Sequence, residues 1–375
     1  MSLFFNPCLM PFTGNAFLIC DSPTSQQSTH LLHVLISNSL AFGDSYTYVQ
    51  GTYGRQNYSF IGDLQNYSFT PEKLLSDEIV QNQTGTSAGG PNWVEYLTGC
   101  FSGLPSRCTK QLWNFAFAGS DVSTEYTPLH HNYSVSLTNQ IAQWNTYARP
   151  VLPATLSKSL VAVFIGINDI SDTSKYTFPH PATTTNTSAS DFASLYSQII
   201  STEMEALETV YEAGYRNFLF LNLPPLERTP SNVAPGATPH PNSTQIQTYN
   251  ALLTTSTTTF TSTHPGARTM LFDTYSYLTS ILDNPGPYGI TNTTSFCPRY
   301  DAPDISTNYA AYGCLPLEEY FWYNAGHVTW RVHGFLARAV GTFLEGERER
   351  GDDEWWMSGN GRKMNKRVQE GETAD

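Results

Sequence analysis

Five short apolar runs divide the chain and predict buried β-strands. Each run is bounded by turn-forming or polar residues and is too short for a core helix. They cover residues 33–44, 112–119, 159–169, 216–225 and 268–276. We therefore expect a sheet of five buried strands.

The segments between these runs carry a helical pattern. In the clearest, residues 191–215, apolar side chains recur every three or four positions, Asp191 can cap the start and Gly214 can end the helix. Residues 136–149, 244–260 and 327–344 behave similarly. Strand and helix thus alternate, which predicts an α/β fold: a three-layer α/β/α sandwich around a mainly parallel, doubly wound sheet. Because ligands bind beyond the carboxyl ends of such strands, functional residues should lie where strands end.

Composition and charge exclude several kinds of partner. The chain has 375 residues, of which 40% are hydrophobic, and a formal net charge of -13. It can bury the core of one large domain, and no internal boundary is strong enough to split the body. Binding to phosphate backbones needs clustered Lys and Arg, so we expect no nucleic-acid partner. No stretch approaches the ~18 apolar residues of a membrane span, and we expect no membrane partner either.

The two ends of the chain differ from its body. Residues 345–375 hold 15 of the 51 charged residues, which predicts a charged, disordered tail. Residues 1–30 form a leader without Lys or Arg, interrupted by Asn6, Pro7, Pro11 and Gly14, and it matches a signal peptide poorly. The body between them, residues 31–344, is predicted to be the functional domain.

Several features favour an exported protein. Seven Asn-x-Ser/Thr sequons occur, at Asn57, Asn66, Asn82, Asn132, Asn186, Asn242 and Asn292. Six cysteines fall as Cys8 with Cys20, Cys100 with Cys108, and Cys297 with Cys314, without zinc-binding spacing. Disulfides in an oxidising compartment are the better interpretation, although six cysteines permit 15 pairings. We expect a secreted glycoprotein.

Three strand ends carry candidate chemistry. Gly43-Asp44-Ser45 follows the first strand and can present a hydroxyl at the edge of the sheet, although it is not the G-x-S-x-G pattern. Gly119 ends the second strand, where its backbone N–H could approach a ligand. Asn168 follows the third and offers an amide side chain. Alone, the Ser45 turn is better explained as an ordinary turn, and the other two are explained as well by a turn as by a function.

Their order along the chain is more informative. Gly-Asp-Ser-x-Thr, a later glycine, Gly-x-Asn-Asp and a C-terminal histidine resemble the four blocks of the GDSL, or SGNH, hydrolase superfamily. Residues 89–97, 115–120 and 222–230 resemble secreted acetyl esterases of carbohydrate esterase family sixteen. The resemblance spans roughly residues 40–344 and implies the flavodoxin-like SGNH hydrolase fold.

The resemblance also assigns roles. Ser45 would be the nucleophile and His327 the general base. The oxyanion hole would be formed by the N–H groups of Ser45 and Gly119 and by the side chain of Asn168. A serine hydroxyl needs a base to accept its proton, and the tetrahedral oxyanion needs donors placed in advance.

The histidine block departs from the family pattern. The family usually has Asp-x-x-His-Pro-Thr, whereas this chain has Asn324-Ala325-Gly326-His327-Val328-Thr329. Asn324 can accept a hydrogen bond from the imidazole but brings no negative charge, and a turned amide would favour the wrong tautomer. A backbone carbonyl, or one of the acidic residues that precede the block, could orient His327 instead. These acidic residues are Asp301, Asp304, Glu318 and Glu319.

Three further residues near this block have two interpretations. Trp322 and Tyr323 precede Asn324 and could form a platform for a sugar ring, or could belong to the core. His333 lies inside the following helix and is interpreted as structural.

The resemblance implies a secreted serine esterase that removes acetyl groups from carbohydrates through an acyl-enzyme, as a monomer without a metal or cofactor. Two alternatives stay open. One is a lipase or longer-chain carboxylesterase of the same fold. The other is a carbohydrate-binding glycoprotein whose site is weakened by Asn324 and Val328.

Overall fold

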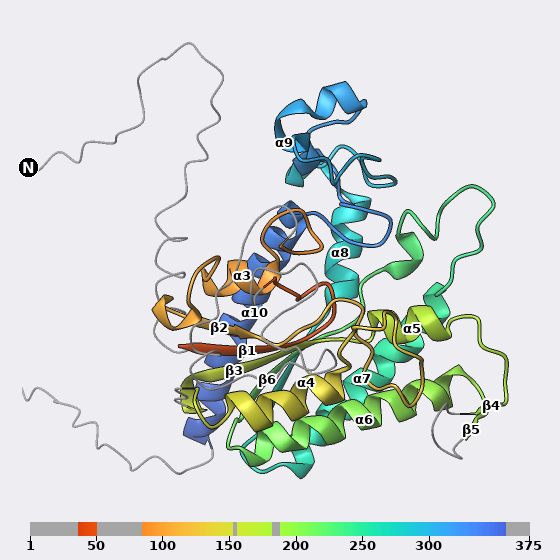
Figure 1. Ribbon diagram of the computed structural model, residues 1–375. Helices are drawn as coiled ribbons and strands as arrows, with labels where there is room; N and C mark the ends of the chain where they lie inside the picture. The colour runs from red at the N-terminus through yellow and green to blue at the C-terminus, as the bar shows by residue number, and fades with distance from the viewer. Residues whose placement is uncertain (1–36, 51–84, 153–155, 182–187, 358–375) are drawn as a thin grey trace, which may run out of the picture.

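The computed structural model describes residues 37–50, 85–152, 156–181 and 188–357 (Figure 1). The leader, Cys8 and Cys20 lie outside these residues, as do the sequons at Asn57, Asn66, Asn82 and Asn186. The predicted first strand is described only from residue 37.

The centre of the fold is a five-stranded sheet with the order β2-β1-β3-β6-β7. Every neighbouring pair is parallel. The strands are β1 (Asn38–Gly43), β2 (Gln111–Asn114), β3 (Ser159–Phe164), β6 (Asn217–Leu221) and β7 (Arg268–Phe272). The predicted mainly parallel five-stranded sheet is thus confirmed. The strands after β1 are added on one side of it (β2) and then on the other (β3, β6 and β7), and such folds bind ligands where this order of addition reverses, between β1 and β3.

Helices cover both faces of the sheet (Figure 1). One layer contains α4 (Leu137–Gln143), α6 (Phe192–Glu212) and α7 (Ser243–Thr263), and the other contains α3 (Trp93–Thr98) and α10 (Trp330–Met357). The remaining helices are α5 (Ile167–Thr173), α8 (Thr274–Asp283) and α9 (Ile305–Asn308). A short antiparallel pair, β4 (His180–Pro181) and β5 (Ser188–Ala189), lies apart from the main sheet. The three-layer α/β/α prediction therefore holds.

Local sequence signals explain the long helix α6. Asp191 accepts the Ser194 N–H and Ser194 Oγ accepts the Asp191 N–H, which satisfies two otherwise unpaired donors at the start. The helix ends just before Gly214, which has a φ of 102° that favours glycine. Both predicted ends are confirmed.

The predicted strands are too long at their carboxyl ends. β3 stops at Phe164, whereas the apolar pattern continued to residue 169, and α5 begins at Ile167. Gly166 separates the two with a φ of 106°. An apolar run does not distinguish a buried strand from the buried first turn of the next helix.

Residues 345–357 of the predicted tail are part of α10, which continues to Met357. The helix is already formed at Leu344, and each added residue then gains one backbone hydrogen bond at little cost. Glu347 also lies 3.8 Å from Arg268 of β7 in an ion pair. Residues after 357 lie outside the described part.

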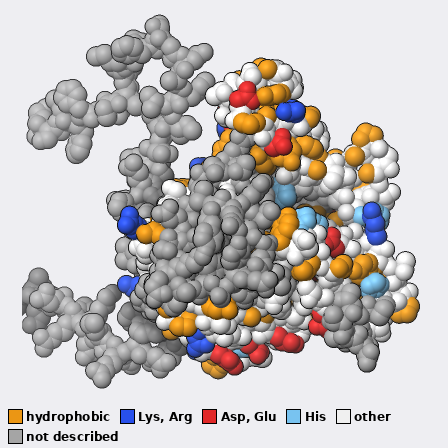
Figure 2. Space-filling model, viewed as in Figure 1, with side chains coloured by type: hydrophobic (Ala, Val, Ile, Leu, Met, Phe, Trp, Pro, Cys, Tyr) orange, Lys and Arg blue, Asp and Glu red, His pale blue; other side chains and the backbone are white. Residues whose placement is uncertain are grey.

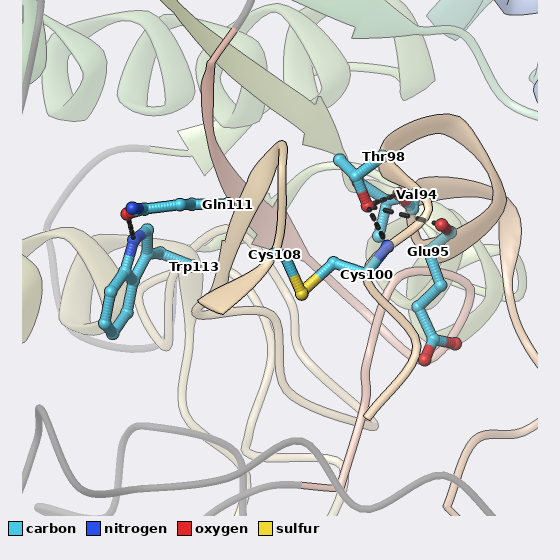
Figure 3. The surroundings of a disulfide bond; sticks show 7 residues. All are labelled: Val94, Glu95, Thr98, Cys100, Cys108, Gln111 and Trp113. Carbon is cyan, nitrogen blue, oxygen red and sulfur yellow. Dashed lines mark hydrogen bonds between the residues drawn. A yellow bond between two sulfur atoms is a disulfide. The ribbon is translucent and has the colours of Figure 1, made fainter. Parts of the chain in front are cut away.

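Two disulfides join cysteines that are close in sequence. Cys100–Cys108 links the end of α3 to the segment before β2, beside the hydrogen bonds of Thr98 (Figure 3). Cys297–Cys314 closes the loop around α9 and is part of a small apolar cluster beside the main core. Two of the three suggested pairings are therefore confirmed.

Candidate active site

Ser45 lies in a tight turn at the carboxyl end of β1. Gly43 has a φ of 147°, and a Cβ atom there would lie 2.1 Å from the Phe164 carbonyl oxygen, so only glycine fits. The Asp44 carbonyl then accepts the N–H groups of Thr47 and Tyr48, which closes the turn. Ser45 is left at the cavity surface with 8% of its area exposed.

Neighbouring segments hold this turn in place. Asn92 caps α3 and donates from its Nδ2 to the carbonyls of Thr47 (2.7 Å) and Tyr48 (3.0 Å). Gln140 of α4 accepts the Gly43 N–H at 3.0 Å and donates to the Gly43 carbonyl at 2.8 Å. The nucleophile turn is thus fixed from both layers of helices.

His327 reaches Ser45 from the other end of the chain. Trp322 and Val328 form an antiparallel bridge, and the Tyr323 N–H donates to the His327 carbonyl at 2.7 Å, so residues 323–327 form a tight loop. The Tyr46 hydroxyl donates to the Gly326 carbonyl at 2.8 Å. The loop places His327 Nε2 2.7 Å from Ser45 Oγ, although the two residues are 282 positions apart.

Asn324 orients the imidazole. Its Oδ1 atom lies 2.9 Å from His327 Nδ1 and also accepts the N–H groups of Gly326 (3.0 Å) and His327 (2.9 Å). Because backbone N–H groups can only donate, this atom must be the amide oxygen. His327 Nδ1 therefore carries a proton and Nε2 can accept one from Ser45.

The acidic residues that precede the histidine block in sequence do not orient the His327 imidazole. Asp304 accepts from Asn308 and Tyr312, and Glu319 accepts from Thr291. In the described residues, no carboxylate hydrogen-bonds to the His327 imidazole. The side chain that orients His327 is neutral.

Burial, and then the nearby His130, lower the pKa of His327 from its ordinary 6.5 to about 4. Among the described residues, no carboxylate hydrogen-bonds to the imidazole and raises its pKa again. The imidazole is therefore uncharged at neutral pH and able to act as a base.

The predicted oxyanion donors meet in the same cavity. Gly119, with a φ of 74°, and Asn168, at the start of α5, both line it together with Ser45 and His327. Asn168 Nδ2 donates to the Ser120 carbonyl at 2.8 Å, and an amide nitrogen carries a second proton for another acceptor. The buried Asp169 carboxylate accepts the Val122 N–H at 3.0 Å and so ties α5 to the loop after Gly119.

The cavity has a volume of about 380 Å³ and includes residues that the sequence analysis missed. Its lining also includes His130 and His131 and a segment that contributes Thr229, Ser231, Asn232 and His240. Figure 2 shows histidine side chains, in pale blue, gathered on the right half of the visible face. The adjacent histidines at 130–131 are a sequence signal that could have pointed to this site, but nothing in their polar surroundings indicates where the loop folds.

Trp322 and Tyr323 do not line the cavity, so the structure contradicts their interpretation as a sugar platform. Trp322 is 1% exposed and donates from Nε1 to the Thr293 carbonyl. Tyr323 packs in the apolar cluster around the Cys297–Cys314 disulfide. The core interpretation is right for both, because the bridge at Trp322 turns these side chains inward. His333 is 2% exposed and packs against Tyr46, as expected of a structural histidine.

In the described part of the chain, no three His, Cys, Asp or Glu side chains are grouped to hold a metal ion. A search of its helices finds none that is both long and apolar enough to cross a membrane.

Comparison with known proteins gives consistent matches. The family model for GDSL-like lipase/acylhydrolase matches residues 40–330. An acetylesterase of Thermothelomyces thermophilus is 26% identical over 70% of this chain and 77% of its own. A GDSL esterase/lipase of Arabidopsis thaliana is 27% identical over 54% of this chain and 56% of its own. A crystal structure from Lactobacillus plantarum aligns with a TM-score of 0.38 and 12% identity, over 84% of this chain and 99% of that one.

Proposed function

The chain belongs to the GDSL-like lipase/acylhydrolase family of ester hydrolases, and we propose that it is a secreted serine esterase that removes acetyl groups from carbohydrates. The observation that carries the proposal is the 2.7 Å distance between Ser45 Oγ and His327 Nε2, with His327 Nδ1 held by Asn324. It is the arrangement required for a nucleophilic serine with a general base.

The reaction has two steps. His327 Nε2 takes the Ser45 proton while Oγ attacks the ester carbonyl, and the imidazolium then gives that proton to the leaving alcohol oxygen. The acetyl group stays on Ser45 as an ester. Water, deprotonated by His327, attacks this ester and releases acetate, and the proton returns to Ser45.

Donors at the cavity edge would stabilise the oxyanion of both steps. The N–H groups of Ser45 and Gly119 and the second N–H of Asn168 are the groups available there. Loss of one such donor typically reduces turnover by about 10² to 10³.

Two observations support an acetylated carbohydrate as the substrate. The Thermothelomyces relative is named an acetylesterase. The cavity lining also offers the side chains of Thr229, Ser231 and Asn232, which can exchange hydrogen bonds with sugar hydroxyls. The aliphatic side chains among the lining residues are Ala118, Ile167 and Leu226, which can contact the methyl group of an acetyl ester.

Secretion is supported by the two disulfides and by the sequons. Disulfides persist in oxidising compartments. Of the sequon asparagines in the described residues, Asn132 and Asn242 are exposed and accessible to a glycan.

Replacement of Ser45 by Ala tests the proposal. The variant should release no 4-nitrophenol from 4-nitrophenyl acetate above background and should not react with a fluorophosphonate probe, whereas the wild type should do both. A wild type that folds but does not label would favour the carbohydrate-binding alternative. Activity on esters of eight or more carbons but not on acetate would favour the longer-chain esterase.

A further inference from the structure

The cavity contains a second oriented histidine besides His327. His130 Nδ1 lies 3.1 Å from Asp172 Oδ2, and both side chains are partly exposed, at 39% and 29%. This pair has the carboxylate that the catalytic histidine lacks. It takes no part in the two reaction steps described above.

The pair is built from the same elements as the oxyanion site. Asp172 follows Asn168 by four residues on α5, so both side chains lie on one face of that helix. A Cβ atom added to Gly119 would lie 3.2 Å from His130 Cδ2 and 3.1 Å from His131 Cδ2. The Cδ2 atom of His130 therefore lies beside Gly119, and its Nδ1 atom lies beside Asp172 of α5.

Neighbouring rings fix the orientation of His130. His131 meets it edge to face at 4.7 Å and is itself stacked on Tyr133 at 5.0 Å. With Asp172 on one edge and His131 beside it, the imidazole has little freedom to rotate. Such support is typical of a group that recognises a ligand in a defined geometry.

The hydrogen bond to Asp172 determines what the other nitrogen can do. An ionised carboxylate only accepts, so Nδ1 of the neutral imidazole carries the proton. Nε2 then has a free lone pair and accepts a hydrogen bond. The chemical group that fits it is a hydroxyl.

We propose that His130, oriented by Asp172, binds a free hydroxyl of the substrate sugar next to the acetyl ester and so selects partially acetylated carbohydrates. This inference rests on the proposed function. It adds a specificity-determining pair on the wall of the cavity that Gly119 and α5 form.

The test compares three esters with full-length protein. Mono-O-acetylated methyl xyloside has free hydroxyls, the fully acetylated methyl xyloside has none, and 4-nitrophenyl acetate has no sugar. The variant His130→Phe keeps a ring against Gly119 and His131 but has no nitrogen. His180→Phe is the matched control, because His180 stacks on Tyr176 and does not line the cavity.

For His130→Phe we expect kcat/KM on the mono-acetylated xyloside to fall about tenfold or more, mainly through KM, since a hydrogen bond to substrate is lost. On the other two esters the loss should be several-fold smaller, because they offer no free sugar hydroxyl. Asp172→Asn should also reduce kcat/KM on the mono-acetylated xyloside, but by less than His130→Phe. His130→Gln, which retains a hydrogen-bond acceptor, should lose less of this activity than His130→Phe. His180→Phe should match the wild type on all three.

Equal losses on all three esters, or no loss on any, would overturn the proposal. A wild type that cleaves 4-nitrophenyl acetate but neither xyloside would also overturn it, and would leave the esterase activity standing. If the wild type cleaves none of the three, the proposed function itself fails.

Discussion

A single oxygen, Oδ1 of Asn324, accepts the His327 Nδ1–H and two backbone N–H groups of the same loop. The asparagine therefore selects the tautomer that a general base needs and also shapes the turn that carries the base. What it does not supply is charge.

Replacement of Asn324 by Asp should raise turnover. The carboxylate can accept all three N–H groups, so the loop keeps its form, and it stabilises the imidazolium that forms during the reaction. A hydrogen bond to a charged group contributes about 1 kcal/mol more than a neutral one, which corresponds to about a fivefold gain in kcat. Steady-state kinetics on 4-nitrophenyl acetate measures this. A tenfold loss in a folded Asn324→Asp variant would show that the site depends on the amide.

The pH dependence of the wild type should reflect the burial of His327. The base works only when deprotonated, and burial lowers its pKa to about 4. Activity should rise as pH increases through the acid limb and reach its plateau well below 6.5. The profile of kcat/KM between pH 3 and 8 measures the limb. In Asn324→Asp the limb should move upward, because the carboxylate raises the pKa of the imidazole.

Tyr46 should act as a positioning residue. Its hydroxyl donates to the Gly326 carbonyl at 2.8 Å, and its ring lies 5.5 Å from that of His327. Tyr46→Phe loses one hydrogen bond of about 1 kcal/mol, so kcat should fall about three- to tenfold while KM stays unchanged. Tyr126→Phe loses a hydroxyl bonded to Thr202, away from the cavity, and should affect only the melting temperature. Equal kcat values for the two variants would contradict a positioning role.

The fold was predictable because its strongest signals are local. Five apolar runs of strand length, separated by helical patterns, allow few arrangements other than a doubly wound sheet. The places of Ser45, Gly119 and Asn168 followed from the rule that strand ends of such a sheet meet at one edge. Their roles came from the resemblance to the family.

What the sequence did not reveal depends on tertiary contacts. His130 and His131 lie in a polar loop, and only packing against Gly119 brings them to the cavity. The direction of the Asn324 amide depends on two backbone donors that converge only in the folded loop. Trp322 precedes the site in sequence, but the bridge to Val328 turns it into the core. In each case, a neighbour far away in sequence or a local backbone reversal decides the outcome.

Buried carboxyl groups should make the protein less stable at alkaline pH. Glu203 of α6 is 1% exposed, and burial raises its pKa to about 8. Burial also raises the pKa of Asp44 to about 7 and that of Asp169. A group with a raised folded-state pKa contributes stability that is complete below its unfolded pKa and is lost as pH rises through the folded value.

Replacement of Glu203 by Gln tests this effect at a single group. From pH 6.5 to 9 the wild type should lose free energy of unfolding, and Glu203 should account for about 2 kcal/mol of the loss, since one pKa unit corresponds to ~1.4 kcal/mol. Burial lowers the pKa of His327 to about 4 and that of His333 to about 3. These two groups reduce the free energy of unfolding as the pH falls below the ordinary histidine pKa of 6.5, so they do not affect the range from 6.5 to 9. The melting temperature of Glu203→Gln should therefore fall less than that of the wild type over this range, and at pH 9 it should be the higher of the two.

The control is Glu205→Gln, at an exposed position of the same helix, whose melting temperature should follow that of the wild type. An unchanged slope in Glu203→Gln would mean that Glu203 is already ionised in the folded protein at neutral pH.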